Sequence, residues 1–177
     1  IGRKRELDDL EQRYKNGNFE IAVIYGRRRV GKTTLINEFI KDKEAIFYTG
    51  IEGNEKENLE GLSKSIYSLS QDFAEASSSF TSYEEALETV FKIAKKRRIV
   101  FVIDEYPYIA GSYITLSSIL QIIIDKNKDI SKMFLILCGS SLSFMENQVL
   151  GYKSSLFGRR TCQYKIMPFD FFEIKDY

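Results

Sequence analysis

The feature that most constrains this chain is an apolar run that leads directly into a glycine-bounded loop and then into a helical pattern. The run is Ala22–Tyr25, and the loop Gly26–Thr33 has the form G-x-x-x-x-G-K-[ST]. Gly26 and Gly31 permit backbone angles closed to other residues, so successive N–H groups can converge on one anion at the positive end of a helix. The motif predicts a phosphate-binding P-loop; the alternative is an ordinary glycine-punctuated turn between strand and helix.

Within this loop each residue type has an expected role. Lys32 would reach the β- and γ-phosphates of a nucleotide, and the Thr33 hydroxyl would bind Mg²⁺. The three arginines point outward from the phosphate, where they would meet a nucleotide base, a partner or only water. The candidate cofactor-binding residues of the loop are Gly26, Arg27, Arg28, Arg29, Val30, Gly31, Lys32, Thr33 and Thr34.

A second apolar run, Ile99–Ile103, ends in two adjacent carboxylates, Asp104 and Glu105. Adjacent residues at a strand end point in different directions, so Asp104 can serve the Mg²⁺ shell while Glu105 faces the γ-phosphate and activates a water molecule. The alternative is a strand that ends in a solvated acidic turn before Pro107. Because a P-loop lies upstream, we interpret Asp104 as a metal ligand and Glu105 as the catalytic base.

Polar residues also follow the apolar run Met133–Cys138, where Gly139 leads into Ser140 and Ser141. Ligands of open α/β sheets bind at the carboxyl ends of strands, so either serine could donate to the γ-phosphate or to the attacking water. The alternative is an N-cap for a helix over Leu142–Leu150. One serine could cap the helix while the other senses the phosphate.

Five short β-branched or aromatic runs alternate with helical patterns, which predicts an α/β fold with a parallel sheet covered by helices on both faces. The Ile99 and Met133 runs are almost continuously apolar, so we expect central strands that neighbour the P-loop strand. The five predicted strands are Ile21–Tyr25, Ala45–Thr49, Ile99–Ile103, Met133–Cys138 and Gln163–Met167.

Apolar residues at three- and four-residue steps predict the helices. A capping-box pattern at Ser82 and Glu85 marks the start of one of them, and serine-rich Ala74–Ser82 reads as a loop. The predicted helices are Val30–Lys41, Glu55–Leu69, Ser82–Lys96, Ser117–Ile124 and Leu142–Leu150.

Composition excludes several classes of function. The 26 basic and 25 acidic residues nearly cancel, so any site for a polyanion must be local. The chain has no histidine, which removes Ser-His and Cys-His nucleophilic pairs and the usual zinc ligands. Cys138 and Cys162 lack C-x-x-C spacing and suit buried thiols in a reducing compartment. No apolar run approaches the roughly 20 residues of a membrane span and no export signal is present, so we expect a cytoplasmic protein without a membrane partner.

Two further basic clusters need interpretation. Lys95–Arg98 lies at a predicted helix C-terminus, where the helix dipole favours cations, so we assign it no site. Arg159 and Arg160 precede the fifth predicted strand in a segment containing glycine and serine. They could form an arginine finger supplied to a neighbouring subunit, a cis sensor, or a solvated or salt-bridged structural pair.

These segments resemble those of the prokaryotic, archaeal-type AAA+ and STAND-related P-loop ATPases, in order and over nearly the whole chain. The matching segments are Ile1–Leu7, Gly26–Thr34, Val102–Tyr108, Leu137–Ser141 and Leu156–Arg160. The resemblance implies the ASCE P-loop core, a three-layer α/β sandwich around a five-stranded parallel sheet of order 5-1-4-3-2.

The resemblance also implies ATP as the nucleotide, with Mg²⁺. It places Gly2 and Arg3 against the adenine and gives Ser140 or Ser141 the sensor-1 position. Members of the family often continue into a winged-helix or lid region and a nuclease-like effector domain. The chain begins at Ile1 and stops at Tyr177, so we expect residues 1–177 to form one ATP-binding core cut from a longer polypeptide before its lid.

The sequence therefore predicts Mg²⁺-dependent ATP binding and slow hydrolysis by a module that drives or switches a C-terminal effector domain. Its expected partners are ATP, ADP, the missing domain and, through Arg159 or Arg160, a second copy. A guanine-specific N/T-K-x-D segment is absent from the sequence. Two alternatives stay open: a non-hydrolysing ATP-binding switch, and a DNA-handling ATPase, for which the near-neutral charge gives no support.

Overall fold

The computed structural model describes residues 2–69 and 79–169 and contains one five-stranded parallel sheet. Its order is β2-β3-β4-β1-β5, which is the expected 5-1-4-3-2 read in reverse. Central strands β1, β3 and β4 are buried at every position, because helices cover both faces of the sheet. The strands are β1 (Glu20–Tyr25), β2 (Ala45–Thr49), β3 (Ile99–Asp104), β4 (Met133–Gly139) and β5 (Cys162–Lys165).

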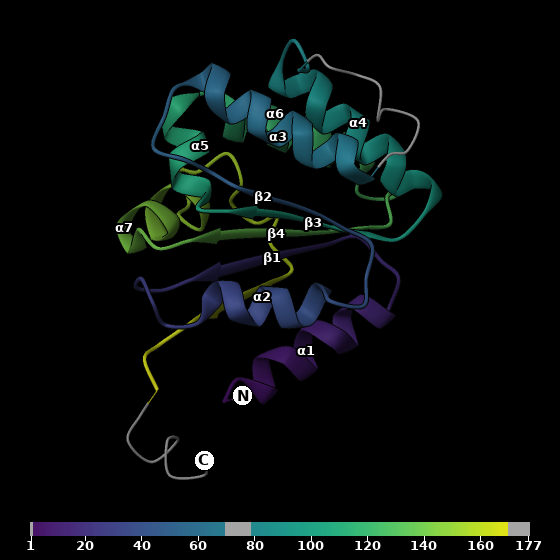
Figure 1. Cartoon of the computed structure of the whole chain (residues 1–177). Coiled ribbons are helices and arrows are strands. Elements are labelled where there is room, and N and C mark those ends of the chain that lie inside the picture. Colours follow the sequence, from purple (N-terminus) through teal and green to yellow (C-terminus); the bar gives the residue numbers. More distant parts are fainter. Residues whose placement is uncertain (1, 70–78, 170–177) are drawn as a thin grey trace.

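Two helical layers enclose the sheet (Figure 1). On one face α1 and α2 share an apolar cluster with Ala22 and Ile24 of β1, and on the other α3 to α6 share a second cluster with Ile21 and Val23. The helices are α1 (Lys4–Lys15), α2 (Lys32–Ile40), α3 (Glu55–Leu69), α4 (Tyr83–Lys96), α5 (Tyr106–Ser112), α6 (Leu116–Asn127) and α7 (Leu142–Phe144), which continues into the π-helical turn η2 (Met145–Val149).

The three-layer architecture and strand order are confirmed, while several local expectations are corrected. Strand β3 pairs with β2 and β4 and does not touch β1, because burial on both faces identifies a central strand without naming its neighbours. Helices α1 and α5 were not predicted. The expected helix over Leu142–Leu150 is broken into α7 and η2. Most of the predicted serine-rich loop, residues 74–78, lies outside the described residues.

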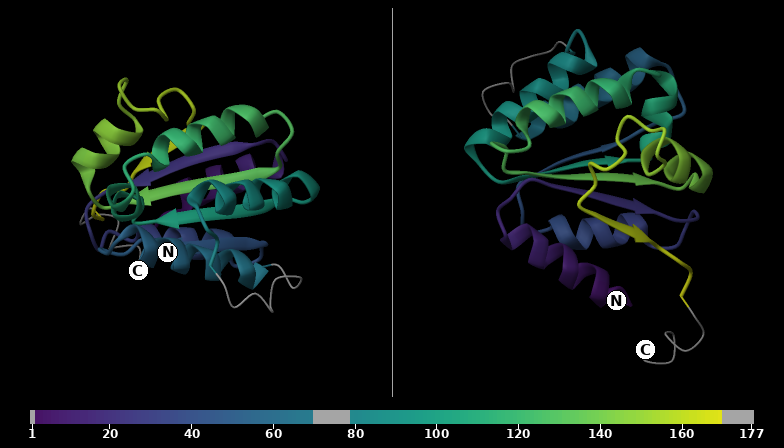
Figure 2. Two further views of the ribbon diagram at one scale, coloured as in Figure 1. Left: turned by 90° about the horizontal axis from the view of Figure 1, so that it is seen from above. Right: turned by 180° about the vertical axis from the view of Figure 1, so that it is seen from behind.

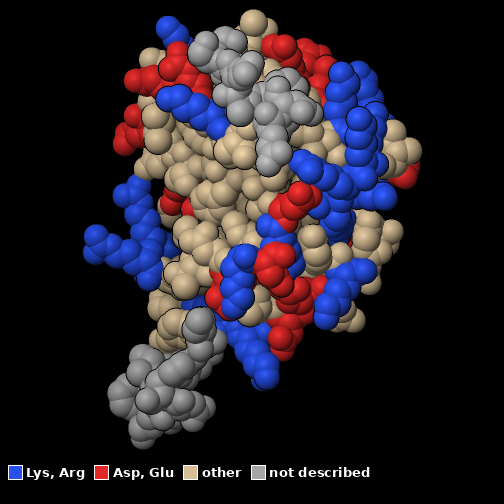
Figure 3. Space-filling model, turned by 45° about the vertical axis from the view of Figure 1, so that its right-hand side comes forward, with Lys and Arg blue, Asp and Glu red and all other residues tan. Residues whose placement is uncertain are grey.

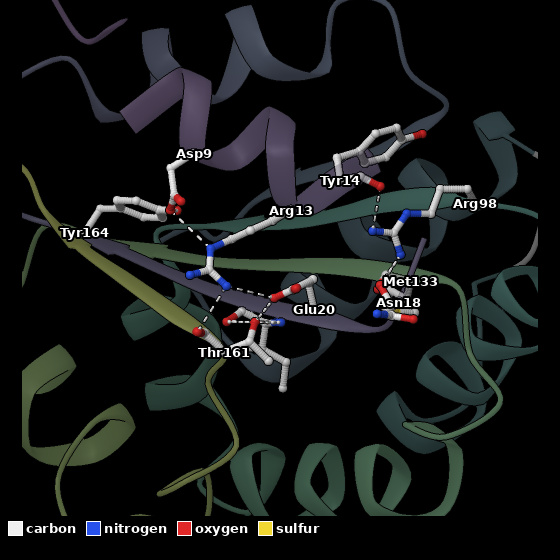
Figure 4. Close-up of polar contacts among 10 residues, drawn as sticks. Asp9, Arg13, Tyr14, Asn18, Glu20, Arg98, Met133, Thr161 and Tyr164 are labelled. Carbon is white, nitrogen blue, oxygen red and sulfur yellow. Dashed lines mark hydrogen bonds and ion pairs between the residues drawn. The ribbon is translucent and has the colours of Figure 1, made fainter. Parts of the chain in front are cut away.

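Edge strand β5 lies beside β1, as the right-hand view of Figure 2 shows, and α1 ties it to the rest of the domain. Asp9 on α1 accepts hydrogen bonds from Arg13 Nε (3.1 Å) and from the Tyr164 hydroxyl on β5 (Figure 4). Arg13 also approaches Glu20 Oε2 at 3.6 Å at the start of β1. These contacts hold β5 in register beside the strand that leads into the P-loop.

In the part of the chain that is described, no single helix is long and apolar enough to cross a membrane. Helices α5 and α6 meet the length and composition criteria only together, and they are bent by 109° at the break between them.

Candidate functional site

The P-loop leaves the carboxyl end of β1 with the backbone geometry that its glycines predict. Gly26 has φ +156°, and a Cβ there would lie 2.2 Å from the carbonyl oxygen of Ile166. Gly31 has φ +92° and caps the N-terminus of α2, and Arg29 is also left-handed at φ +64°. Only glycine fits at position 26, because a side chain would collide with the backbone of the segment that follows β5.

Lys32 is buried, with 6% of its surface exposed, and lies over the loop. Its Nζ donates hydrogen bonds to the carbonyl oxygens of Gly26 (2.9 Å) and Arg27 (2.8 Å). Both acceptors are neutral backbone carbonyl oxygens. The ammonium group therefore has no carboxylate partner within the loop. A phosphate placed in the loop would therefore meet an uncompensated, prepositioned cation.

Thr33 and Asp104, the two expected Mg²⁺ ligands, are joined directly. Thr33 Oγ1 donates to Asp104 Oδ2 at 2.9 Å, and Asp104 Oδ1 accepts the Glu105 backbone N–H at 2.9 Å. A hydroxyl and a carboxylate are hard oxygen donors that suit Mg²⁺, which commonly takes one or two protein carboxylates and completes its shell with phosphate oxygens and water. Among the described residues no cluster of three or more His, Cys, Asp or Glu side chains forms a self-sufficient metal site.

Glu105 occupies a strained backbone position that aims its side chain across the sheet edge. Its φ of +48° and ψ of +44° are left-handed, and α5 begins at the next residue with Pro107 in its first turn. The side chain accepts hydrogen bonds from Ser140 Oγ, 2.8 Å from both carboxylate oxygens. Left-handed conformation in a non-glycine residue costs about 1–3 kcal/mol, so the surrounding structure must hold Glu105 in place.

Two glycines flank this acidic turn and let it fit between neighbouring strands. Gly50, just after β2, donates to the Asp104 carbonyl at 2.8 Å, and a Cβ there would lie 2.7 Å from the Glu105 carbonyl oxygen. A Cβ at Gly139 would lie 2.8 Å from the Pro107 ring. The packing of both strand ends thus fixes the Asp104–Glu105 turn.

The two serines after β4 differ in their contacts. Ser140 reaches Glu105, as described above, whereas Ser141 is exposed at the N-cap position of α7 and makes no side-chain capping bond. The capping alternative for these serines is therefore not observed. The structure brings Ser140 to the acidic turn, and a sensing role for either serine stays a prediction.

The N-terminal box lies against the P-loop. Arg3, 8% exposed, donates to the carbonyl oxygens of Val30 (3.3 Å) and Met167, and its guanidinium lies 4.2 Å from the centre of the Phe169 ring. A Cβ on Gly2 would lie 2.6 Å from the same ring. The box therefore joins the loop to the segment after β5, and contact of Gly2 and Arg3 with adenine stays a prediction.

Of the remaining loop residues Val30 is buried, with 8% of its surface exposed, and the others face outward. Arg28 donates to the Tyr108 hydroxyl on α5, so one of the three arginines bridges the P-loop and the helix after Glu105. Side chains at Arg27, Arg29 and Thr34 are exposed. Sequence reasoning missed Tyr108, although its position three residues after Glu105 in an expected site segment was a usable signal.

Arg159 and Arg160 lie at the opposite edge of the sheet. Cys162 of β5 is paired with Ala22 of β1, so residues just before β5 are near the amino ends of the strands, whereas the P-loop follows their carboxyl ends. Arg159 forms a bidentate ion pair with Asp125 of α6 at 2.8 and 3.0 Å. This geometry favours the structural salt bridge for Arg159 and does not support a cis sensor.

Arg160 is exposed and has no ion-pair partner in residues 2–69 and 79–169. Cys138 and Cys162 are both free thiols; Cys138 is buried, as expected, whereas Cys162 is only half-buried. Cys138 is buried on β4, and burial raises the pKa of its thiol, with the nearby Asp104 carboxylate adding to the effect. Cys138 is therefore neutral and inert at the centre of the sheet.

Comparison with known proteins identifies the family to which this chain belongs. The model of a family described as an ATPase domain predominantly from Archaea matches residues 1–176. The uncharacterized protein MJECL04 of Methanocaldococcus jannaschii is 34% identical over all 177 residues, which span 38% of its length. The uncharacterized ATP-binding protein MJ0423 of the same organism is 43% identical over 44 residues, 25% of this chain and 75% of that protein.

Solved structures share the fold. The Walker-type ATPase PABY2304 of Pyrococcus abyssi superposes with a TM-score of 0.68 at 21% identity, over 97% of this chain and 55% of that one. Cdc6p of Pyrobaculum aerophilum gives 0.66 at 16% identity, over 98% and 47%. ORC1 of Aeropyrum pernix, solved in complex with DNA, gives 0.63 at 19%, over 98% and 47%. The chain thus spans about half the length of these structures or less.

Proposed function

The chain belongs to the family of ATPase domains found predominantly in Archaea, and from this premise we propose that it binds Mg-ATP at the P-loop and hydrolyses it with Glu105 as the base. The observation that carries the proposal is the convergence of four side chains from two segments at one edge of the sheet. Lys32 and Thr33 come from the P-loop, Asp104 and Glu105 from the end of β3, and Thr33 and Asp104 are in contact at 2.9 Å.

In this proposal different side chains would bind the phosphates, hold Mg²⁺ and accept the proton of the attacking water. Lys32, already turned over the loop, would hold the β- and γ-phosphates, and the loop N–H groups would bind the same anion. Thr33 and Asp104 would hold Mg²⁺, which when bound supplies charge neutralisation of the phosphates. Glu105 would take a proton from the attacking water, and Ser140, 2.8 Å from the carboxylate, would fix its direction.

Replacement of Glu105 by glutamine tests this division of labour. The change keeps shape and removes the base, so we expect Mg-ATP to bind as before while the single-turnover hydrolysis rate falls by about 100-fold or more. Glu88→Gln is the matched control, because Glu88 is exposed on α4 and is in no ion pair among the described residues. A Glu105→Gln variant that hydrolyses at the parent rate would contradict the proposal and favour the non-hydrolysing switch.

The finer features of the proposal rest on the resemblance to AAA+ and STAND-related ATPases. Adenine would lie against Gly2 and Arg3, and hydrolysis would drive or switch a further C-terminal domain. Free thiols at Cys138 and Cys162 suit a reducing, cytoplasmic compartment. Because the chain spans 38% of the length of MJECL04, these features concern a longer protein.

Self-association is the remaining part of the proposal. Arg159 is engaged by Asp125, so we assign a contact in trans with a second copy's γ-phosphate to the exposed Arg160. ATPase activity per chain would then rise with protein concentration, and a mixture of Arg160→Ala with Glu105→Gln protein would recover activity. Activity independent of concentration, with no recovery in the mixture, would contradict the assignment.

A further inference from the structure

The edge of the sheet opposite the P-loop carries a dense group of cations that form no ion pair with the described residues. Seven basic side chains lie on the segments that lead into β1, β3 and β4. None of them has an ion-pair partner within the described residues. We refer to them as the amino-edge cationic face. They are Lys15, Lys95, Lys96, Arg98, Lys126, Lys128 and Lys132.

Arg98 gathers these segments into one surface (Figure 4). Its guanidinium donates to the carbonyl oxygens of Tyr14 (3.2 Å) and Lys132 (2.9 Å), and also to those of Asn18 and Met133. Lys132 N–H in turn donates to the Ala94 carbonyl at 2.8 Å, beside Lys95 and Lys96. The lysines that follow Tyr14, Ala94 and α6 are therefore held together by backbone contacts, although they are far apart in the sequence.

Cations outnumber carboxylates at this surface, although Glu20 lies near Arg98 and Asp125 lies near Lys128. The cations of neighbouring segments that do form ion pairs, Arg97 with Glu44 and Arg159 with Asp125, are already neutralised. Asp129 is the unpaired carboxylate that the α6–β4 segment contributes. Figure 3 shows the lysine and arginine side chains crowded along its right-hand edge, the side on which the strands begin in Figure 1. Like charges held this close repel one another, so the face costs stability unless an anion binds it.

A hollow of about 580 Å³ opens within this face. Lys128, Lys132 and the ion-paired Arg159 line it together with the carboxylate of Asp129, polar groups of Asn18, Ser131 and Thr161, and two glycines. Lysine, asparagine, serine and threonine side chains and free backbone N–H groups are the usual contacts of nucleic-acid phosphates. The curved row of phosphates along a duplex can enter such a hollow, while a flat surface cannot.

We propose that the amino-edge cationic face binds the phosphate backbone of double-stranded nucleic acid, independently of base sequence and at the opposite end of the sheet from the nucleotide. Lysine is depleted in protein–protein interfaces, which rely on aromatic anchors, so a protein partner fits less well. Single-strand binding needs aromatic stacking platforms, and a membrane surface needs inserted apolar side chains. Of the three large apolar residues that line the hollow, Ile124 is buried and Phe19 is half-buried, so Ile130, 59% exposed, is the one that faces solvent.

Fluorescence anisotropy with a labelled DNA duplex of arbitrary sequence, about 20 base pairs long, tests the proposal between about 50 and 200 mM salt. We expect the parent protein to bind with a Kd of about 10⁻⁴–10⁻⁶ M at physiological salt, as sequence-independent contacts do. The Lys128→Ala/Lys132→Ala variant should bind about 10-fold more weakly or worse. Its slope of log K against log salt should be shallower by about 2, since two phosphate contacts are lost.

The matched control is Lys64→Ala/Lys153→Ala, which removes the same charge from exposed positions on α3 and on the segment after η2, and should bind as the parent does. All substituted lysines are exposed, and thermal unfolding followed by circular dichroism would verify the fold. Three results would overturn the proposal: a parent that does not bind duplex at 50 mM salt, a Lys128→Ala/Lys132→Ala variant that binds like the control, or tighter binding to polyglutamate or to phosphatidylserine vesicles than to duplex. None of these results would affect the proposed ATP site.

Discussion

The two edges of the sheet differ in whether their charged side chains have partners within the protein. At the carboxyl-terminal edge Asp104 and Glu105 each accept hydrogen bonds from a neighbouring strand or loop, and Lys32 is folded onto its own loop. At the amino-terminal edge six lysines around Arg98 face solvent with no carboxylate partner among the described residues. Hydrogen bonds hold the side chains of the first edge in place, which suits a small, highly charged ligand. The second offers charge without fixed geometry, which suits a large polyanion that can be bound in many registers.

The two edges also differ in how tightly their glycines are packed. We therefore expect glycine substitutions to give the largest difference in the free energy of unfolding between the edges. Gly26→Ala would force a Cβ to within 2.2 Å of the Ile166 carbonyl oxygen at φ +156°, so we expect a loss of about 3 kcal/mol or more in the free energy of unfolding. Gly17, at the amino-terminal edge, has φ +72° and open space around it, so Gly17→Ala should cost about 1 kcal/mol. Urea unfolding measures both, and equal costs would contradict the comparison.

A smaller effect is expected from the hydrogen bond that holds Glu105. Ser140→Ala removes a donor to a carboxylate, an interaction worth about 1.5–3 kcal/mol, so single-turnover hydrolysis should slow by about 10-fold or more while Mg-ATP affinity is kept. Ser143→Ala is the control, because Ser143 is exposed on α7 and its side chain makes no hydrogen bond among the described residues. Equal rates in the two variants would remove Ser140 from the positioning of the base.

Much of the carboxyl-terminal edge could be predicted because each of its parts is continuous in sequence. The P-loop, the Asp104–Glu105 turn and Ser140 each follow an apolar strand directly, and parallel strands bring such ends together. Helix α5 was missed because Pro107 and Gly111 lie within its seven residues and hide its periodicity. The Ser140 contact with Glu105 depends on the left-handed backbone of Glu105, which no propensity favours.

The amino-terminal edge could not be predicted from the same sequence. Lys15, Lys95 and Lys132 are separated by long stretches of chain, and a net charge of +1 gives no sign that they meet. Lys95–Arg98 alone has the composition of an ordinary helix C-terminus. Only the strand order and the contacts of Arg98 bring these residues to one surface, so the tertiary structure carries this information.

The smallest expected effect concerns the ion pair that does exist at the amino-terminal edge. The hydrogen bond from Arg159 holds the pKa of Asp125 below its usual value. Because the native pKa is lowered, the pair stabilises the fold above the unfolded pKa of about 3.9, and this contribution is lost as pH falls through the native value. The side chains of Arg159 and Asp125 are 26% and 40% exposed, so solvent screens the pair and its contribution should be under about 1 kcal/mol.

Asp125→Asn should therefore lower the urea midpoint slightly at pH 7 and leave it unchanged in strong acid. Asp129→Asn is the control, because Asp129 is in no ion pair among the described residues and should show no such pH dependence. The same pH dependence in both variants would mean that the Arg159 contact contributes nothing to stability.

Calorimetric titration of Mg-ATP into the parent and Lys32→Ala proteins tests the central claim most directly, since Lys32 is the buried, uncompensated cation of the site. Loss of one charge-assisted phosphate contact costs about 1.5–3 kcal/mol, so Lys32→Ala should bind about 10- to 100-fold more weakly. Lys64→Ala, on the exposed surface of α3, should bind like the parent. Unchanged affinity in Lys32→Ala would remove this residue from the phosphate site and contradict the assignment of the P-loop as the nucleotide site.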